Sequence, residues 1–475
     1  MTAEVIPKTF TFIAVQTVAI TFSALLLGPL GPIQTRSQSS NSVVLYEGAR
    51  LIPGDGSPAI ESAAMLVENG RITWISKGRV DGPRERLAAR VDLTGKTIMP
   101  ALINTHGHPG FQRGLTYSAA NFTRETIMDD MNRALFFGVA AVQSQGIEKG
   151  EVMYEIRADQ EAGRSGGARL RLAGRGIGAP DAGPGAAAYA GIAYEVTTEG
   201  QARQAVQELA GKKVDLIKIW VDDRNGRAPR LASNLYRVII QEGHKRGLKV
   251  NAHVFYHSDA VELVDAGIDG FAHLVRDKEM DDGLVASILR HNVYVMPNLS
   301  PEWNTYWDLP HWLRDGDPLL TLLQESVSPP VIARMRSEYE NRNSEAVERT
   351  RAQYAILQRS LAKLARANAK IILGSDTGLQ DHLFGMSEQR ELESMANAGM
   401  SPMQVIIAAT SRAAEYLKLD KLGVLAAGKE ATFLVLDANP LDNITNTQRI
   451  SGIYVKGVAV DRTALRQSLT KVAQN

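Results

Sequence analysis

The chain has 475 residues, of which 44% are hydrophobic, so it can bury the core of one large domain together with a smaller one. Its 53 Lys and Arg residues balance 52 Asp and Glu residues, and the formal net charge of +1 supports no general attraction to nucleic acid or an anionic membrane. The absence of cysteine excludes disulfides, thiolate metal sites and a cysteine nucleophile. Any bound metal must therefore have nitrogen and oxygen ligands.

Residues 1–40 are predicted to form a targeting segment rather than part of the fold. Lys8 precedes an almost uncharged run, Thr9–Pro29, that is rich in Phe, Ile, Val and Leu and is followed by a polar linker. This pattern predicts a signal peptide and an exported protein, either periplasmic or secreted. The run is long and no clear small-x-small cleavage site follows it, so an uncleaved membrane anchor is the alternative.

Short strand patterns separated by turns occupy residues 43–98 and return over residues 420–465. The dipeptide Asn69-Gly70 lies between two such patterns and predicts a hairpin turn. We expect both ends of the chain to meet in a small β-sandwich domain. The predicted strands are Val43–Tyr46, Arg50–Ile52, Ala63–Glu68, Arg71–Ile75, Thr432–Leu436, Ile453–Val455 and Val458–Val460.

Between these flanks, residues 99–419 alternate apolar strands with helical stretches. The pattern favours a (β/α)₈ TIM barrel, in which functional groups lie at the carboxyl ends of the strands. A doubly wound open sheet is the alternative, but no Gly-x-Gly-x-x-Gly follows the first strand. The predicted strands are Ala101–Thr105, Ala140–Ser144, Leu170–Gly174, Leu216–Val221, Lys249–Ala252, Gly270–Ala272, Val293–Met296 and Ile371–Gly374.

Histidine and aspartate residues gather at the ends of these predicted strands. Residues i and i+2 of a strand point to the same face, so the two histidines that end the first strand leave it side by side. Each of these residues also has a purely structural interpretation, such as a polar loop histidine, a lysine reaching solvent or a helix N-cap. A barrel would bring the following residues together: His106, His108, Lys218, His253, His273 and Asp376.

The motifs around these residues resemble the amidohydrolase superfamily, close to its imidazolonepropionase-like and prolidase-like metal-dependent hydrolases. The resemblance covers residues 43–462, and the motifs occur in the family's order. Gly423–Phe433 also resembles the family's return into its small β-sandwich. The motifs are Met99–His108, Ile217–Ile219, Asn251–His253, Gly267–His273 and Leu373–Thr377.

The resemblance implies a centre of two divalent metal ions. Neutral imidazoles and hard oxygen ligands suit Zn²⁺. Lys218, carboxylated on its side-chain nitrogen, would bridge the two ions as an anionic ligand. The more buried ion would be held by His106, His108 and Asp376, and the more exposed one by His253 and His273.

A centre of this kind implies hydrolysis by a metal-bridging hydroxide. Asp376 would act as general base and then as general acid toward the leaving nitrogen, and His273 could also contact the developing oxyanion. The expected substrate is a small molecule with an amide or other non-ester C–N bond: an N-acyl amino acid, a dipeptide or a cyclic amide. The alternatives are hydrolysis of a lactone, ester or phosphotriester, or a non-catalytic relative acting as an interaction protein.

Substrate contacts are predicted in two places, and a third region lacks a residue that relatives use for substrate. Prolidase-like relatives often carry Gly-Gly-His after the third strand, whereas Gly178–Gly185 has no histidine, which puts a dipeptide carboxylate in doubt. Tyr256 is a candidate contact, or a rim aromatic that packs on the barrel. Trp303 and Trp307 lie in an insertion over residues 299–369, which is expected to form a lid or substrate wall. The insertion could instead cap the barrel or mediate homo-oligomer contacts.

Overall fold

The computed structural model describes residues 43–78, 89–183, 185, 187–299, 313–379 and 382–472. The predicted targeting segment, residues 1–40, lies outside these residues, as do Trp303 and Trp307. Within the described ranges, every helix is too short or too polar to cross a membrane.

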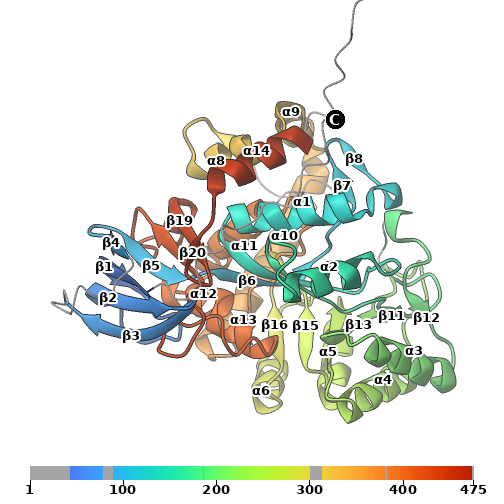
Figure 1. The fold of residues 1–475 in the computed structure, drawn as a ribbon. Helices are drawn as coiled ribbons and strands as arrows, with labels where there is room; N and C mark the ends of the chain where they lie inside the picture. The colour runs from blue at the N-terminus through green and yellow to red at the C-terminus, as the bar shows by residue number, and fades with distance from the viewer. Residues whose placement is uncertain are drawn as a thin grey trace, which may run out of the picture. The chain divides into compact units, whose positions relative to one another are not determined.

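Strands from both ends of the chain form one mixed sheet, in which the early strands (blue) lie beside the late ones (orange to red) in Figure 1. The strand order is β20-β19-β18-β5-β1-β2-β3, and β4 pairs with β1. The strands are β1 (Val43–Leu51), β2 (Ile60–Glu68), β3 (Arg71–Lys77), β4 (Ala89–Asp92), β5 (Thr97–Pro100), β18 (Phe433–Leu436), β19 (Ile450–Val455) and β20 (Val458–Ala459).

Two local features of this sheet bear on the sequence predictions. Asn69 and Gly70 form the β2–β3 turn with φ angles of 52° and 76°, which confirms the predicted hairpin. The separate strands predicted over 43–46 and 50–52 are wrong, because β1 runs through both. Gly48, with a φ of 90°, allows an irregular register in place of a turn.

The central block contains parallel strands in two hydrogen-bonded groups, ordered β10-β9-β6 and β12-β11-β13-β14-β15-β16-β17. Each of the eight predicted strands is present, and the short strands β11 and β12 were not predicted. The strands are β6 (Leu102–Gly107), β9 (Val139–Ser144), β10 (Arg169–Arg171), β11 (Ile177–Gly178), β12 (Tyr194–Glu195), β13 (Leu216–Val221), β14 (Lys249–Val254), β15 (Gly270–Ala272), β16 (Tyr294–Met296) and β17 (Lys370–Ile371).

Backbone hydrogen bonds link the two groups of parallel strands at both ends. The amide of Thr105 donates to the carbonyl of Leu373 (2.9 Å), just beyond β17, and the amide of Asp215 donates to the carbonyl of Leu172 (2.7 Å), just beyond β10. The strands that carry the candidate ligands are therefore connected through a continuous series of main-chain bonds.

Helices follow most of the parallel strands, and several of them begin at a side-chain cap. The side chain of Thr198 caps α3 in a capping box with Gln201, and Asp281 caps α6. Helices α8 to α10 form the described part of the 299–369 insertion. The helices are α1 (Arg124–Phe136), α2 (Val152–Glu161), α3 (Glu199–Gly211), α4 (Ser233–Lys245), α5 (His257–Asp265), α6 (Asp282–Arg290), α8 (Pro318–Ser326), α9 (Pro329–Glu340), α10 (Ser344–Arg366), α11 (Met386–Asn397), α12 (Pro402–Ala409), α13 (Ser411–Tyr416) and α14 (Arg462–Val472).

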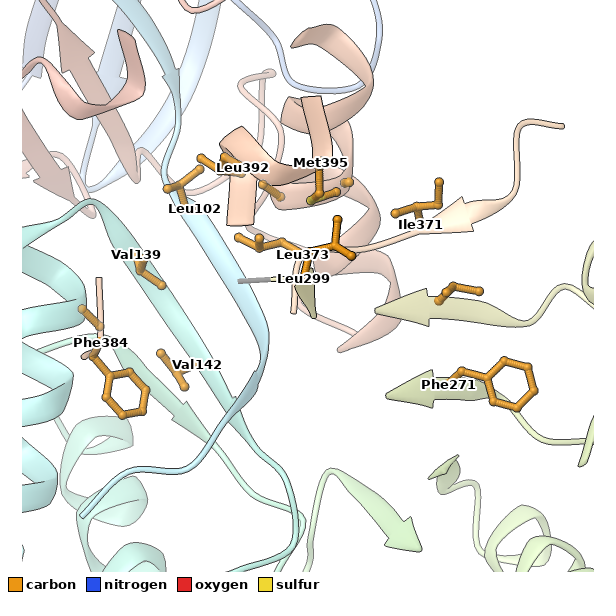
Figure 2. Close-up of a cluster of buried hydrophobic side chains, with 14 of the residues drawn as sticks. Leu102, Val139, Val142, Phe271, Leu299, Ile371, Leu373, Phe384, Leu392 and Met395 are labelled. Atoms are coloured by element: carbon orange, nitrogen blue, oxygen red, sulfur yellow. The ribbon is translucent and has the colours of Figure 1, made fainter. Parts of the chain in front are cut away.

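The main core surrounds the parallel strands. Figure 2 shows Leu102 of β6 and Val139 and Val142 of β9 in one buried cluster with Leu373 and with Leu392 of α11. All five side chains are at most 1% exposed. Parallel strands covered on both faces need such continuous apolar runs, and this packing holds the strand ends at fixed positions.

The mixed sheet has its own aromatic core, which gives a test of the fold. Phe433 is fully buried, stacks on Tyr454 with ring centroids 4.6 Å apart and meets Tyr46 edge-on at 5.1 Å. We expect Phe433→Ala to lower the free energy of unfolding by about 3–5 kcal/mol through lost burial and an unfilled cavity, measured by chemical denaturation. Trp74→Ala, an exposed aromatic of β3, is the control and should cost less than about 1 kcal/mol. Equal losses of unfolding free energy in the two variants would contradict the placement of Phe433 in the core of the mixed sheet.

Candidate metal centre

The structure brings the six predicted ligand residues together around one cavity of about 500 Å³. Lys218 lies within its strand, and the other five come from the carboxyl end of a parallel strand or from the residues that follow it. Five are buried and His253 is partly buried. The residues are His106 in β6 and His108 just after it, Lys218 in β13, His253 in β14, His273 after β15 and Asp376 after β17.

Three imidazoles surround the carboxylate of Asp376. Nε2 of His106 and Nε2 of His108 lie 3.2 Å apart, and they are 3.1 and 2.9 Å from Oδ1 of Asp376. Nε2 of His273 lies 3.8 Å from Oδ2 of the same carboxylate. His106, His273 and Asp376 offer ligand atoms that all lie within 4.8 Å of one another.

Burial sets the protonation state of these groups. It lowers the pKa of His106 and of His273 well below the usual value, because a charged imidazolium is poorly solvated there. Burial is also the largest influence on Asp376 and raises its pKa, but the surrounding histidines together outweigh it and hold that pKa well below its usual range. At neutral pH His106 and His273 are thus neutral and Asp376 is ionised, the states in which these groups bind metals.

Lys218 is buried and lines the same cavity as the histidines. Its charge acts on both His106 and His253, and burial lowers its pKa to about 7 against the opposing effect of Asp376. Gly146, with a φ of 90°, provides the space, because a Cβ atom there would lie 2.9 Å from the Cβ of Lys218. Lys218 therefore lines the cavity in space that only a glycine at position 146 leaves open.

Residues that the sequence reasoning missed orient the histidine rings. Oδ2 of Asp222 accepts a hydrogen bond from Nε2 of His253 (3.1 Å), which directs the other ring nitrogen away from that contact. The side-chain nitrogen of Asn298 lies 2.6 Å from Nδ1 of His106 and 3.3 Å from Nδ1 of His273. Both residues are polar and follow a predicted strand closely, which is the signal that could have identified them.

A buried hydrogen-bond network fixes the end of β6 against helix α11. The side-chain oxygen of Asn104 accepts from the amide of His106 (2.9 Å), and its nitrogen donates to Oε1 of Glu388 (2.6 Å) and to the hydroxyl of Ser375 (2.9 Å). Asn104 thus links the strand of His106 to the segment of Asp376. A polar residue inside an otherwise apolar strand pattern was the available sequence signal.

Three residues at the site have backbone conformations that non-glycine residues rarely adopt. The φ angles are 81° at His273, 52° at Asn298 and 52° at Asp376. Each residue follows a parallel strand, β15, β16 or β17, at the point where the chain turns beside the cavity. Backbone strain of this kind persists where the surrounding structure enforces it, as it does at functional sites.

The predicted substrate contact Tyr256 is not among the residues that line the cavity. The hydroxyl of Tyr256 donates to Oδ1 of Asp223 (2.8 Å), and the guanidinium of Arg230 lies 4.3 Å from the centre of its ring. Its neighbour Phe255 lines the cavity instead. A role for Tyr256 toward substrate stays a prediction. Tyr189, which the sequence reasoning missed, also lines the cavity, with its ring centroid 6.0 Å from that of His108.

The donor set suits a divalent metal ion. Nitrogen and oxygen atoms with lone pairs face one another at 2.9–3.2 Å, an arrangement that a proton or a cation must stabilise. Nδ1 of His108 is buried and has no hydrogen-bond partner among the described residues. These residues therefore fit a metal with N and O ligands, in agreement with the absence of cysteine.

Comparisons with known proteins agree with this geometry. Residues 97–460 match the model of the amidohydrolase family. An uncharacterized protein of Mycobacterium tuberculosis is 27% identical over 232 residues, which cover 48% of this chain and 56% of the relative. A Mycobacterium bovis protein matches to the same extent. The chain thus aligns with little more than half the length of these relatives.

Solved structures share the fold at lower identity. A Xaa-Pro dipeptidase with bound methionine is 20% identical, with a TM-score of 0.68 over 88% of this chain and 100% of its own. A putative prolidase from Bifidobacterium longum is 24% identical (TM-score 0.69; 91% and 99%), and phenylurea hydrolase B is 23% identical (TM-score 0.69; 89% and 98%). These likenesses indicate an α/β fold of the TIM-barrel type. Because the family model spans most of the sequence, the chain belongs to the amidohydrolase family, as its motifs predicted.

Proposed function

We propose that the protein is a metal-dependent hydrolase that cleaves an amide or other non-ester C–N bond of a small molecule. The observation that carries this proposal is the convergence of three histidine rings on the ionised carboxylate of Asp376 in a cavity of about 500 Å³. Membership of the amidohydrolase family supports the same class of reaction. A cavity of this size accommodates a small molecule rather than a folded protein.

The proposed centre holds two divalent ions, with Zn²⁺ the best match to the donors. His106, His108 and Asp376 would hold one ion, His253 and His273 the other, and Lys218, N-carboxylated, would bridge them. When bound, the ions would make hydroxide available near neutral pH and polarise the carbonyl under attack. Lys218 lines the same cavity as His106 and His253, which supports its bridging role.

Asp376 is proposed to move the proton. Its Oδ1 is engaged by His106 and His108 at 3.1 and 2.9 Å, whereas its Oδ2 lies 3.8 Å from His273, beyond hydrogen-bond distance. Oδ2 is thus the oxygen placed to take a proton from the attacking water and deliver it to the leaving nitrogen. Asn298 would keep the His106 and His273 rings oriented during this exchange.

Three further features of the chain remain proposals. The parallel strands are proposed to close into a (β/α)₈ barrel, with the mixed sheet acting as a small β-sandwich domain. Residues 1–40 are proposed to direct export or to anchor the protein in a membrane. The insertion over residues 299–369 is proposed to contribute a substrate wall or a homo-oligomer contact.

Replacing Asp376 tests its role as general base and acid. We expect Asp376→Asn to lower kcat by about 10²–10⁴-fold while leaving the unfolding midpoint near that of the wild type, because the amide cannot take the proton. Steady-state kinetics and thermal unfolding give the two readouts. Asp282→Asn, whose side chain is fully exposed, is the matched control and should leave both unchanged. Near-normal turnover by Asp376→Asn would refute the assignment.

Metal content tests the bridging role of Lys218. Protein purified without chelator or added metal should contain about two equivalents of divalent ion per chain, and Lys218→Ala should retain about one or fewer because the bridging ligand is lost. Elemental analysis measures this directly. The exposed Lys278→Ala is the control and should match the wild type. Two retained equivalents in Lys218→Ala would show that the lysine does not bridge.

A substrate panel tests the reaction class. The panel contains N-acyl amino acids, dipeptides, cyclic amides, a lactone and a chromogenic phosphotriester. We expect a higher kcat/KM for C–N bonds than for the C–O and P–O bonds, with activity lost after chelation and restored by added metal. Preferred cleavage of the lactone or phosphotriester would reject the proposed amide hydrolysis in favour of C–O or P–O bond hydrolysis.

A further inference from the structure

Arginine side chains line one part of the cavity that contains the candidate ligands. Arg224 and Arg227 belong to the segment after β13, and Arg276 follows His273 by three residues. The whole chain carries a formal net charge of only +1, so this grouping is local. Cationic side chains in a cavity concentrate the potential there and favour anionic ligands.

The two acidic residues of the cavity are engaged elsewhere. Oδ2 of Asp222 accepts from His253 at 3.1 Å, and its Oδ1 accepts from the backbone amide of Arg224 at 2.8 Å. Asp376 is held by the histidines described above. In the part of the chain that the structure describes, no carboxylate lies within ion-pair distance of the Arg224 or Arg227 guanidinium.

A third arginine of the same segment shows the opposite arrangement. Arg230 forms ion pairs with Asp223 and with Asp259, both at 3.0 Å, and does not line the cavity. Asp223 also accepts from Tyr256. Two carboxylates, Asp223 of the segment and Asp259 of α5, therefore compensate Arg230, whereas Arg224 and Arg227 direct their charges to the cavity.

Main-chain carbonyls hold the two cavity arginines in place. The Nη2 of Arg224 donates to the carbonyl of Gly183, across the cavity rim. The Nε of Arg227 donates to the carbonyl of Arg224 (3.1 Å), and its backbone amide donates to the carbonyl of Asp223 (2.8 Å). Groups positioned before a ligand arrives lose less conformational entropy when they bind it.

We propose that Arg224 and Arg227 form a carboxylate-binding subsite, so that the substrate is a small acyl compound that carries a carboxylate. The proposal rests on the hydrolytic function proposed above and narrows its substrate class. A planar guanidinium pairs with a carboxylate through two parallel hydrogen bonds, a geometry that a neutral amide or urea cannot reproduce. Arg276 contributes positive charge to the same cavity while one of its terminal nitrogens contacts Nδ1 of His273 at 3.1 Å.

The test measures binding with ligands that have no bond to hydrolyse. N-benzyl-L-phenylalanine carries the carboxylate, and N-benzyl-L-phenylalaninol is its neutral counterpart. Isothermal titration calorimetry on the metal-containing protein should show the carboxylate binding at least about tenfold tighter. Arg224→Gln and Arg227→Gln should each reduce this ratio by about tenfold, and the double variant should abolish it. Arg230→Gln is the matched control and should keep the wild-type ratio.

Defined outcomes overturn the subsite. Equal affinity of the wild type for the two ligands, no binding of the carboxylate at millimolar concentration, or an unchanged ratio in the double variant would each do so. If the carboxylate bound directly to metal, the affinity ratio would stay the same in the double arginine variant. The variants therefore distinguish binding to metal from binding to the arginines. Turnover of the substrate panel is read independently. Arginine-dependent binding without C–N cleavage would support the subsite and reject the proposed reaction. Preferred cleavage of neutral amides would support the reaction and reject the subsite.

Discussion

The parallel pairing of the central strands is the constraint on which the site depends. Their carboxyl ends meet at one edge, so residues that are far apart in the chain surround one cavity. The strands themselves are rigid because apolar side chains cover them on both faces. Just after β15 and β17 the backbone turns, and at His273 and Asp376 it takes a left-handed conformation beside the cavity.

Electrostatics then decides what the converged residues can do. Burying an ionised carboxylate costs free energy unless partners compensate it, and among the partners of Asp376 burial keeps His106 and His273 neutral. A divalent cation would offset this cost more completely than a proton shared among the rings. The same low-polarity surroundings favour the neutral form of Lys218. The charge states of these residues and the reactivity proposed for them therefore have one cause: burial removes polar groups from water.

In the proposed carboxylate subsite, substrate selection would rest on the segments after the strands rather than on the strands. The missing histidine in Gly178–Gly185 had put a dipeptide carboxylate in doubt, but Gly183 of that loop instead accepts a hydrogen bond from Arg224. A guanidinium can bind an anion where related proteins use a histidine. Loops tolerate such exchange because they carry little of the packed core.

The sequence by itself determined most of the strand positions and the candidate metal ligands, because apolar runs and the histidines at their ends are local patterns. It also determined the Asn69-Gly70 turn, where two residues with positive φ suffice. Only the tertiary structure decided which residues support the ligands: Asp222 and Asn298 contact rings from other strands. It likewise separated Arg230, which is paired, from Arg224 and Arg227, which face the cavity. These distinctions depend on distances between segments remote in the chain, and a linear pattern carries no such distances.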